Sequence, residues 1–146
     1  MKRDRDDTNF RAVIDSFSYK DPDCVFCTVP PDMVIAENHL AYAILDRYPV
    51  TASHALIIPK RHISDYFELG SSESNACQRL LETVRQKLKG QDRTIDGFNI
   101  GINAGEAAGQ TIFHSHIHLI PRRPGDVANP RGGVRHTIPG KGYYDS

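Results

Sequence analysis

Short apolar runs bounded by proline dominate the chain after residue 35. Residues 40–45 form one such run and residues 55–58 form another, with Pro49 between them and Pro59 at the end of the second. Brief apolar runs that stop at turn-forming residues are typical of buried strands. The pattern therefore predicts two strands joined by a turn.

A different periodicity predicts one main helix. Between residues 73 and 89 the apolar side chains recur three or four positions apart, at Ala76, Leu80, Leu81, Val84 and Leu88. This spacing places them on one face of a helix. The serine-rich stretch 71–74 offers an N-cap, and Gly90 offers an end to the helix.

The second half of the chain predicts two further strands and an irregular arm. Residues 97–103 and 112–120 have strand-like patterns, and the glycine-rich residues 104–110 separate them. From about residue 124, repeated prolines and glycines predict an irregular C-terminal arm. Residues 1–21 are mainly charged and polar, apart from a possible amphipathic turn at Phe10, Val13, Ile14 and Phe17. We therefore expect an N-terminal extension over residues 1–21 and a single domain over residues 22–146.

Composition and charge narrow the class of protein. The 146 residues are 39% apolar, which is enough for one core of ordinary size. Lys and Arg number 18 and Asp and Glu number 18, so no overall charge predicts a nucleic acid or an acidic membrane as partner. The run at residues 40–45 is far shorter than the roughly 20 residues of a membrane helix, and no apolar export signal follows the start. We expect a soluble, cytoplasmic protein.

The strongest chemical signal is a row of histidines in the last predicted strand. His114, His116 and His118 stand two residues apart, so their imidazoles should project from one strand face, about 7 Å apart. A solvated polar face and a catalytic metal site of three histidines are alternatives. Solvated strand faces draw mainly on Lys, Glu and Thr, and a metal site leaves the neighbouring glycine-rich loop unexplained.

With this row and its loop, the chain resembles the histidine-triad family of nucleotide hydrolases and transferases. The family motif His-φ-His-φ-His-φ-φ, where φ is apolar, matches residues 114–120 with Ser115 as the one departure. The match extends to residues 103–105, 109–113 and 120–126, and the whole resemblance covers residues 23–126. It implies an α+β fold, in which an antiparallel sheet of about five strands carries one main helix, and a homodimer.

The resemblance also implies roles for individual residues. His116 would attack the α-phosphorus and form a nucleotidyl-histidine that water then hydrolyses, with no metal required for the nucleophilic step. His118 would contact the phosphate or the leaving group, and His54 would lie within hydrogen-bond reach behind the triad. Asp46 would accept hydrogen bonds from the two ribose hydroxyls. The phosphate-side positions of the loop are Asn103, Gly109, Gln110 and Thr111.

A nucleophilic His116 needs a neutral, oriented ring. One ring nitrogen must keep its lone pair, so the other should donate to a fixed acceptor, most simply a backbone carbonyl. Taken alone, Asp46 also fits a turn or cap and His54 a buried structural histidine. Apolar residues near Phe26, Ile35, Leu40 and Leu45 could line a pocket for the base.

Cys24 and Cys27 have the spacing of metal ligands. A lone CxxC also fits a redox disulfide or a pair of buried thiols, so the spacing leaves these alternatives open. Some triad proteins and the related galactose-1-phosphate uridylyltransferases combine such a pair with two histidines, which here correspond to His62 and His114. The resemblance therefore implies a structural zinc site with four protein ligands.

For the activity, the resemblance implies hydrolysis or transfer at the α-phosphate of a purine nucleotide conjugate. Residues 120–126 look more like the dinucleoside polyphosphate hydrolases of the family than like its phosphoramidases. An adenosine phosphoramidate hydrolase is the main alternative, and a nucleotide-binding regulator without catalysis is another. The intact His116 argues against the regulator.

Overall fold

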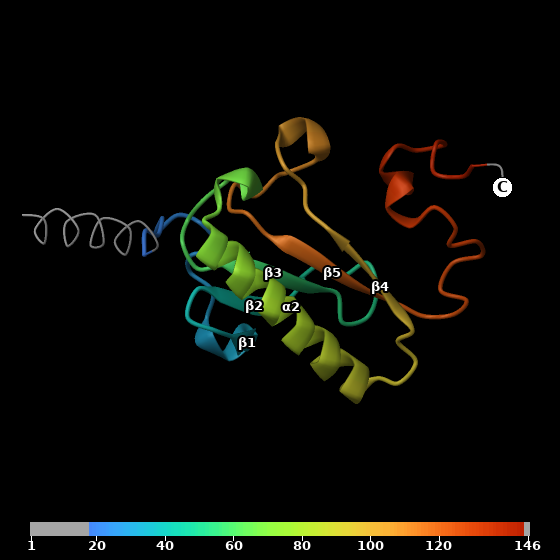
Figure 1. Cartoon of the computed structure of the whole chain (residues 1–146), viewed down its shortest axis with the longest axis horizontal. Coiled ribbons are helices and arrows are strands. Elements are labelled where there is room, and N and C mark those ends of the chain that lie inside the picture. The colour runs from blue at the N-terminus through green and yellow to red at the C-terminus, as the bar shows by residue number, and fades with distance from the viewer. Residues whose placement is uncertain (1–17, 145–146) are drawn as a thin grey trace, which may run out of the picture.

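The computed structural model describes residues 18–144 and shows a five-stranded sheet with one long helix (Figure 1). The strands are β1 (Val34–Glu37), β2 (Ala41–Leu45), β3 (Ala55–Pro59), β4 (Gly97–Gly101) and β5 (Ile117–Arg122), and the helix is α2 (Ser71–Gln91). The strand order is β1-β2-β3-β5-β4, and every neighbouring pair is antiparallel. The expected α+β class with an antiparallel sheet and one main helix is confirmed.

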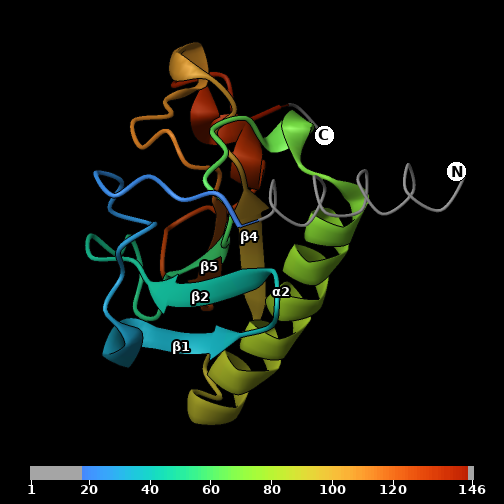
Figure 2. The same cartoon turned by 90° about the vertical axis from the view of Figure 1, so that its left-hand side faces the viewer.

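The central strands are covered on both faces. Alternate residues of β2 and β3 face α2, and the small side chains of Ala41, Ala43 and Ala55 let the helix lie close to the sheet. Tyr42 and Leu56 face the other way and pack in a second cluster with Phe26, which precedes β1. Figure 2 shows α2 on one side of the sheet and the blue segment before β1 on the other. This double burial explains why β2 and β3 are continuous apolar runs.

Helix α2 buries the apolar face that its periodicity predicts, but its ends differ from the prediction. The predicted core residues are all buried: Ala76, Leu80, Leu81, Val84 and Leu88. The helix begins at Ser71 with Gly70 as its N-cap, so no serine caps it. It continues through Gly90 and ends at Gln91. Cys77 is also in the core, where burial raises the pKa of its thiol to about 11.

One charged side chain is enclosed where α2 begins. Glu73 is 1% exposed, and its carboxylate accepts hydrogen bonds from Arg61 at 2.7 and 3.0 Å. The same carboxylate accepts from the Gly70 N–H at 3.0 Å. It therefore holds both the start of the helix and the connection after β3.

We expect Glu73→Ala to lower the free energy of unfolding by about 3 kcal/mol, because it removes a buried carboxylate that pairs with Arg61 and accepts from a helix-terminal N–H. Urea denaturation measures the change. The control is Glu82→Ala at an exposed position of the same helix, which should stay within about 0.5 kcal/mol of the parent. Equal denaturation midpoints for the two variants would contradict the expectation.

The last strand begins later than predicted. The expected strand covers residues 112–120, whereas β5 spans Ile117–Arg122, so only His118 of the three triad histidines lies within it. The Ser115 N–H donates to the Ile63 carbonyl at 2.6 Å instead of joining the ladder with β3. The Ser115 N–H is thus bound to the connection after β3, and regular pairing with β3 begins only at Ile117. Likewise, β4 ends at Gly101 rather than at residue 103.

Residues near both ends of the described part of the chain contact the domain. The amphipathic turn expected at residues 10–17 lies outside the described residues. Residues 19–21, which we assigned to the extension, contact the domain: the His62 N–H donates to the Tyr19 carbonyl at 2.6 Å, and the Asp21 N–H donates to Cys27 Sγ at 3.3 Å. The C-terminal arm contains one 3-10 turn at Gly133–Thr137, which lies beside β4. Within residues 18–144, no helix combines the length and apolar character needed to cross a bilayer.

Candidate active site and metal centre

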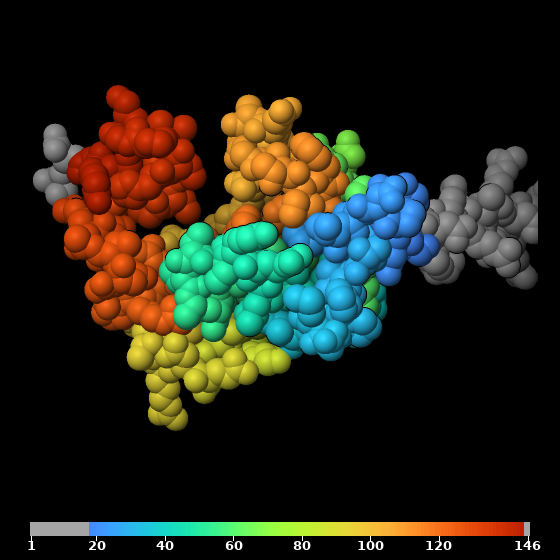
Figure 3. Space-filling view, turned by 180° about the vertical axis from the view of Figure 1, so that it is seen from behind, coloured from blue at the N-terminus to red at the C-terminus, as the bar shows by residue number. Residues whose placement is uncertain are grey.

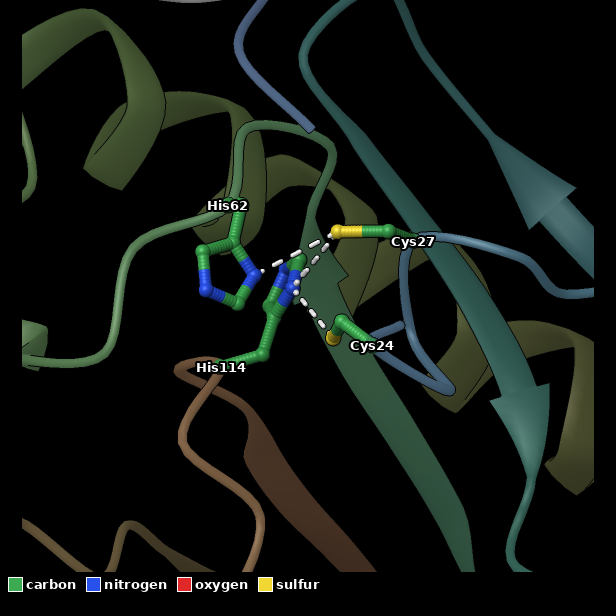
Figure 4. A group of neighbouring side chains, drawn as sticks. All are labelled: Cys24, Cys27, His62 and His114. Carbon is green, nitrogen blue, oxygen red and sulfur yellow. Dashed lines mark hydrogen bonds between the residues drawn. The ribbon is translucent and has the colours of Figure 1, made fainter. Parts of the chain in front are cut away.

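Four side chains from three segments meet beside the entry to β5 (Figure 4). Cys24 and Cys27 come from the loop before β1, His62 from the connection after β3, and His114 from the segment that leads into β5. The Sγ atoms of Cys24 and Cys27 lie 3.4 and 3.5 Å from His114 Nδ1, and Cys27 Sγ lies 3.4 Å from His62 Nδ1. All four ligand atoms lie within 4.8 Å of one another.

The geometry of this cluster fits a tetrahedral metal ion. Bonds of about 2.3 Å to sulfur and 2.0 Å to nitrogen would separate a sulfur and a nitrogen ligand by about 3.5 Å, close to the 3.4–3.5 Å distances observed. His114 Nε2 lies 2.7 Å from the Pro59 carbonyl, so it carries the hydrogen and leaves the Nδ1 lone pair toward the sulfurs. Burial lowers the pKa of His114 to about 4, which keeps this ring neutral near pH 7. The four residues could hold a metal ion.

His116 has one ring nitrogen fixed by the backbone. Its Nδ1 lies 2.8 Å from the carbonyl of His114. A carbonyl only accepts, so Nδ1 carries the hydrogen and Nε2 keeps the lone pair. The side chain is 9% exposed and lines a cavity. The fixed backbone acceptor that a nucleophilic ring requires is therefore in place.

A chain of hydrogen bonds sets the hydrogen positions on the two neighbouring histidines. The Val50 N–H donates to His54 Nδ1 at 3.2 Å, so a neutral His54 carries its hydrogen on Nε2. His54 Nε2 lies 2.9 Å from His118 Nδ1, which accepts this hydrogen. Burial lowers the pKa of both rings, and for His118 burial and the neighbouring His116 bring the pKa to about 4. Near pH 7, His118 is therefore neutral with its hydrogen on Nε2.

The rings of His54, His116 and His118 line a cavity of about 550 Å³. It is bordered by residues from the segment before β1, the loop after β2 and the loop after β4, and Figure 3 shows these blue, green and orange segments gathered on one face. Most of its wall is apolar, with Phe26, Ile44 and Leu56 among the lining residues. Such a cavity, with a few convergent polar groups, is typical of a small-molecule site. The polar side chains in its lining include Asp46, Asn103, Thr111 and the histidines His54, His116 and His118.

The Asp46 carboxylate lies next to His54 and is fixed by a hydrogen bond from the backbone. Its Oδ1 accepts from the Tyr48 N–H at 2.9 Å, and its Oδ2 lies 3.5 Å from His54 Nε2. Its own N–H donates to the His54 carbonyl at 2.8 Å. Each carboxylate oxygen has a further lone pair, so the fixed group can accept from a diol in the cavity.

The loop residues expected at the phosphate divide into two groups. Asn103, Gly109 and Thr111 line the cavity, whereas Gln110 does not. The Gln110 side chain is bound within the protein: its Oε1 accepts from the Gly105 N–H at 2.9 Å, and its Nε2 donates to two backbone carbonyls at 2.9 and 3.2 Å. Its amide thus shapes the loop rather than facing a ligand.

The apolar wall agrees only in part with the expected regions of the chain. Phe26 lines the cavity, but Ile35 and Leu40 pack on the α2 side of the sheet and Leu45 is outside the lining. The sequence did not single out the other lining residues, because a side chain that lines a cavity follows the same local pattern as one in the core or in a turn. For Val25, Val29, Pro30 and Met33, the available signal was proximity to the cysteine pair. The missed residues are Val25, Val29, Pro30, Met33, Ile44, Arg47, Tyr48, Val50, Leu56 and Ile112.

The HIT domain matches residues 28–125, and the chain belongs to the HIT family. The match contains the triad and the loop before it, which confirms the resemblance drawn from those motifs. It begins immediately after Cys27, so the cysteine pair lies outside the matched region.

Known relatives of this chain include enzymes and a metal-bound protein. An adenylylsulfatase from Arabidopsis thaliana is 40% identical over 111 residues, covering 71% of this chain but only 54% of that protein. A zinc-bound histidine triad family protein from Mycobacterium smegmatis is 35% identical with a TM-score of 0.66, covering 73% of this chain and 80% of that one. The diadenosine triphosphate hydrolase of Plasmodium falciparum is 27% identical with a TM-score of 0.63, covering 69% of this chain and 68% of that one.

Proposed function

We propose that this protein hydrolyses or transfers the nucleotidyl group of a purine nucleotide conjugate by attack of His116 on the α-phosphorus. The observation that carries the proposal is the hydrogen bond of His116, whose Nδ1 lies 2.8 Å from the His114 carbonyl, so that Nε2 keeps its lone pair. A neutral imidazole is an effective nucleophile near pH 7 and requires no metal to attack phosphorus.

The proposed reaction has two displacement steps at the same phosphorus. In the first, His116 Nε2 bonds to the α-phosphorus, and the leaving group departs with the electron pair of the bond that breaks. The Nδ1–H stays on the ring, and the His114 carbonyl stabilises the positive charge that forms. In the second step, water attacks the phosphorus, the electron pair of the P–N bond returns to Nε2, and a proton passes to solvent. Two easier steps replace one difficult step.

The nucleoside would occupy the apolar part of the cavity. Asp46 would accept from the ribose hydroxyls, and the wall that includes Phe26 would enclose a purine. Asn103, Thr111 and the backbone at Gly109 would contact the phosphate oxygens. The names of two relatives, an adenylylsulfatase and a diadenosine triphosphate hydrolase, support an adenylyl group as the part that is transferred.

The state of His118 favours a leaving group that is stable as an anion. With a pKa lowered to about 4, His118 is a neutral hydrogen-bond donor rather than a strong acid near pH 7. A polyphosphate can leave as an anion and needs only such a donor, whereas an amine must be protonated as it leaves. We therefore propose dinucleoside polyphosphates as substrates, with adenosine phosphoramidates as the alternative.

A direct comparison of substrates tests this function. Purified protein is incubated with diadenosine triphosphate, diadenosine tetraphosphate, adenylyl sulfate and an adenosine phosphoramidate, and AMP release is followed by chromatography. We expect the largest kcat/KM with one of the two diadenosine polyphosphates, and a preference for adenylyl sulfate would contradict this choice of substrate. A preference for the phosphoramidate would support the alternative, and AMP binding without turnover of any conjugate would support a regulator.

For His118→Ala we expect kcat to fall roughly 10²- to 10³-fold, as for the loss of one donor to a developing negative charge. AMP binding should persist, because the apolar wall and Asp46 remain. Steady-state kinetics measure the effect, and His39→Ala, which removes an exposed histidine, is the control. A kcat unchanged from the parent in His118→Ala would exclude this role.

We propose zinc as the metal for Cys24, Cys27, His62 and His114. Two sulfur and two imidazole ligands are a common set for zinc, and one neighbouring structure of the family is zinc-bound. Four protein ligands would close the coordination sphere, so the ion would supply structural stability and no reactive position.

The proposal also includes a cytoplasmic homodimer, for which β4, at the edge of the sheet with Ile100 exposed, offers a pairing surface.

A further inference from the structure

The loop that carries the two cysteines has two functional sides. The sulfurs of Cys24 and Cys27 face the two histidines of the metal cluster. The residues between and just after them line the nucleotide cavity: Val25, Phe26, Val29 and Pro30. One short segment, residues 24–30, is therefore both half of the metal centre and a wall of the cavity.

Phe26 connects the two sides directly. Its ring is 7% exposed and lies 5.9 Å, centroid to centroid, from the ring of the metal-cluster residue His114. It lies 5.0 Å from the ring of His116, and both pairs have edge-to-face geometry. Edge-to-face pairs of rings are attractive and have a preferred orientation. A shift of Phe26 would therefore change both the cavity wall and the packing around His116.

Few hydrogen bonds join this loop to the sheet, although the apolar side chains of Phe26 and Val29 pack on it. Residues 24–30 belong to no strand or helix. Most of its hydrogen bonds are local: two turn hydrogen bonds of 3.1 Å lie within residues 21–27, Thr28 Oγ1 donates to the Cys24 carbonyl at 2.9 Å, and the Met33 N–H donates to the Pro30 carbonyl at 3.0 Å. From the sheet, the Tyr42 hydroxyl donates to the Phe26 carbonyl. A segment with few backbone hydrogen bonds opens more easily than the sheet on which it packs. An ion bound by both cysteines would connect this loop to His62 and His114, which belong to other segments of the chain.

We propose that metal binding at the cysteine and histidine cluster and nucleotide binding in the cavity are positively coupled through the loop 24–30, with Phe26 as the positioning residue. This rests on the proposed function, because the cavity must bind a nucleotide. The metal holds the loop in the conformation that completes the cavity wall, so the nucleotide no longer has to order it. Coupling is reciprocal, so the nucleotide strengthens metal binding by the same factor.

The test measures both sides of this thermodynamic cycle. The affinity for AMP is determined by calorimetry with zinc-loaded and with metal-free protein, and circular dichroism verifies that α2 remains folded without metal. Zinc affinity is determined by competition with a chromophoric chelator, with and without saturating AMP. We expect zinc to raise the affinity for AMP about tenfold and AMP to raise the affinity for zinc by the same factor, within the range typical of coupled sites. In addition, AMP should slow zinc release to excess chelator, a readout that needs no folded metal-free protein.

Variants separate the link from the pocket. Phe26→Ala should bring the coupling factor close to one, and Phe26→Leu, which keeps an apolar side chain at this buried position, should reduce it partly. Val50→Ala is the matched control, because Val50 lines the cavity from the loop after β2. It should weaken AMP binding equally with and without zinc and leave the coupling factor unchanged.

The outcomes are distinguishable. AMP affinity that is equal in the two metal states, with zinc release that AMP does not slow, would overturn the coupling and leave the proposed function intact. A coupling factor that Phe26→Ala and Phe26→Leu do not change would overturn the role of Phe26. Absence of AMP binding to the zinc-loaded protein would overturn the proposed function itself.

Discussion

Replacement of His116 by alanine should abolish turnover of the preferred conjugate, with kcat falling by several orders of magnitude. The variant lacks the only nitrogen that the mechanism places on the α-phosphorus, so no nucleotidyl-histidine can form. AMP affinity should change little, because Asp46 and the apolar wall are untouched. Steady-state kinetics and calorimetry measure the two quantities.

The covalent step has a readout of its own. Parent protein mixed briefly with a conjugate labelled in its α-phosphate and then denatured in alkali should retain label, because a phosphorus–nitrogen bond to imidazole is stable in alkali and labile in acid. His116→Ala should retain none, and His39→Ala, which changes an exposed histidine, should retain as much as the parent. A His116→Ala variant with near parental kcat would refute nucleophilic catalysis by His116.

Loss of zinc should have the largest effect on stability. Cys24→Ser or Cys27→Ser removes a ligand from a closed site, and the free energy of metal binding in such sites is folding free energy. Loss of about a quarter of the roughly 10 kcal/mol that a structural zinc supplies would lower the Tm of a domain of this size by about 10 °C. Calorimetry measures the Tm, and elemental analysis of the same preparations measures the zinc content.

Removal of zinc by a chelator gives the matching experiment on the parent protein. A strong chelator should lower the Tm of the parent by more than either serine substitution does, because it removes the whole ion, and should lower the Tm of Cys24→Ser by less than that of the parent. Cys77→Ala removes a thiol outside the cluster, so it should keep one zinc per chain. Parent protein purified without chelator that contains clearly less than one zinc per chain would refute the site and leave the role of His116 standing.

Much of the fold follows from short-range patterns in the sequence. Helix α2 has one apolar face from Ala76 to Leu88, and the runs that become β2 and β3 are apolar throughout because both of their faces are buried. The beginning of β5 could not be predicted in this way. Residues 112–116 have a strand-like pattern, but the hydrogen bond of Ser115 to the Ile63 carbonyl competes with the ladder. That contact joins residues 52 positions apart, and no local pattern encodes it.

The chemistry of the site likewise depends partly on the sequence alone and partly on the tertiary structure. The sequence by itself determined which groups are present: three alternating histidines, a polar glycine-rich loop, and cysteines with metal-ligand spacing. The tertiary structure decided what each group does, because hydrogen-bond partners fix the state of a ring. His54 donates to His118 only because Val50 occupies its other nitrogen, and these two histidines are 64 positions apart. The inward turn of the Gln110 amide and the joining of metal centre and cavity wall by one loop also arise from contacts between distant segments, which only the folded chain brings together.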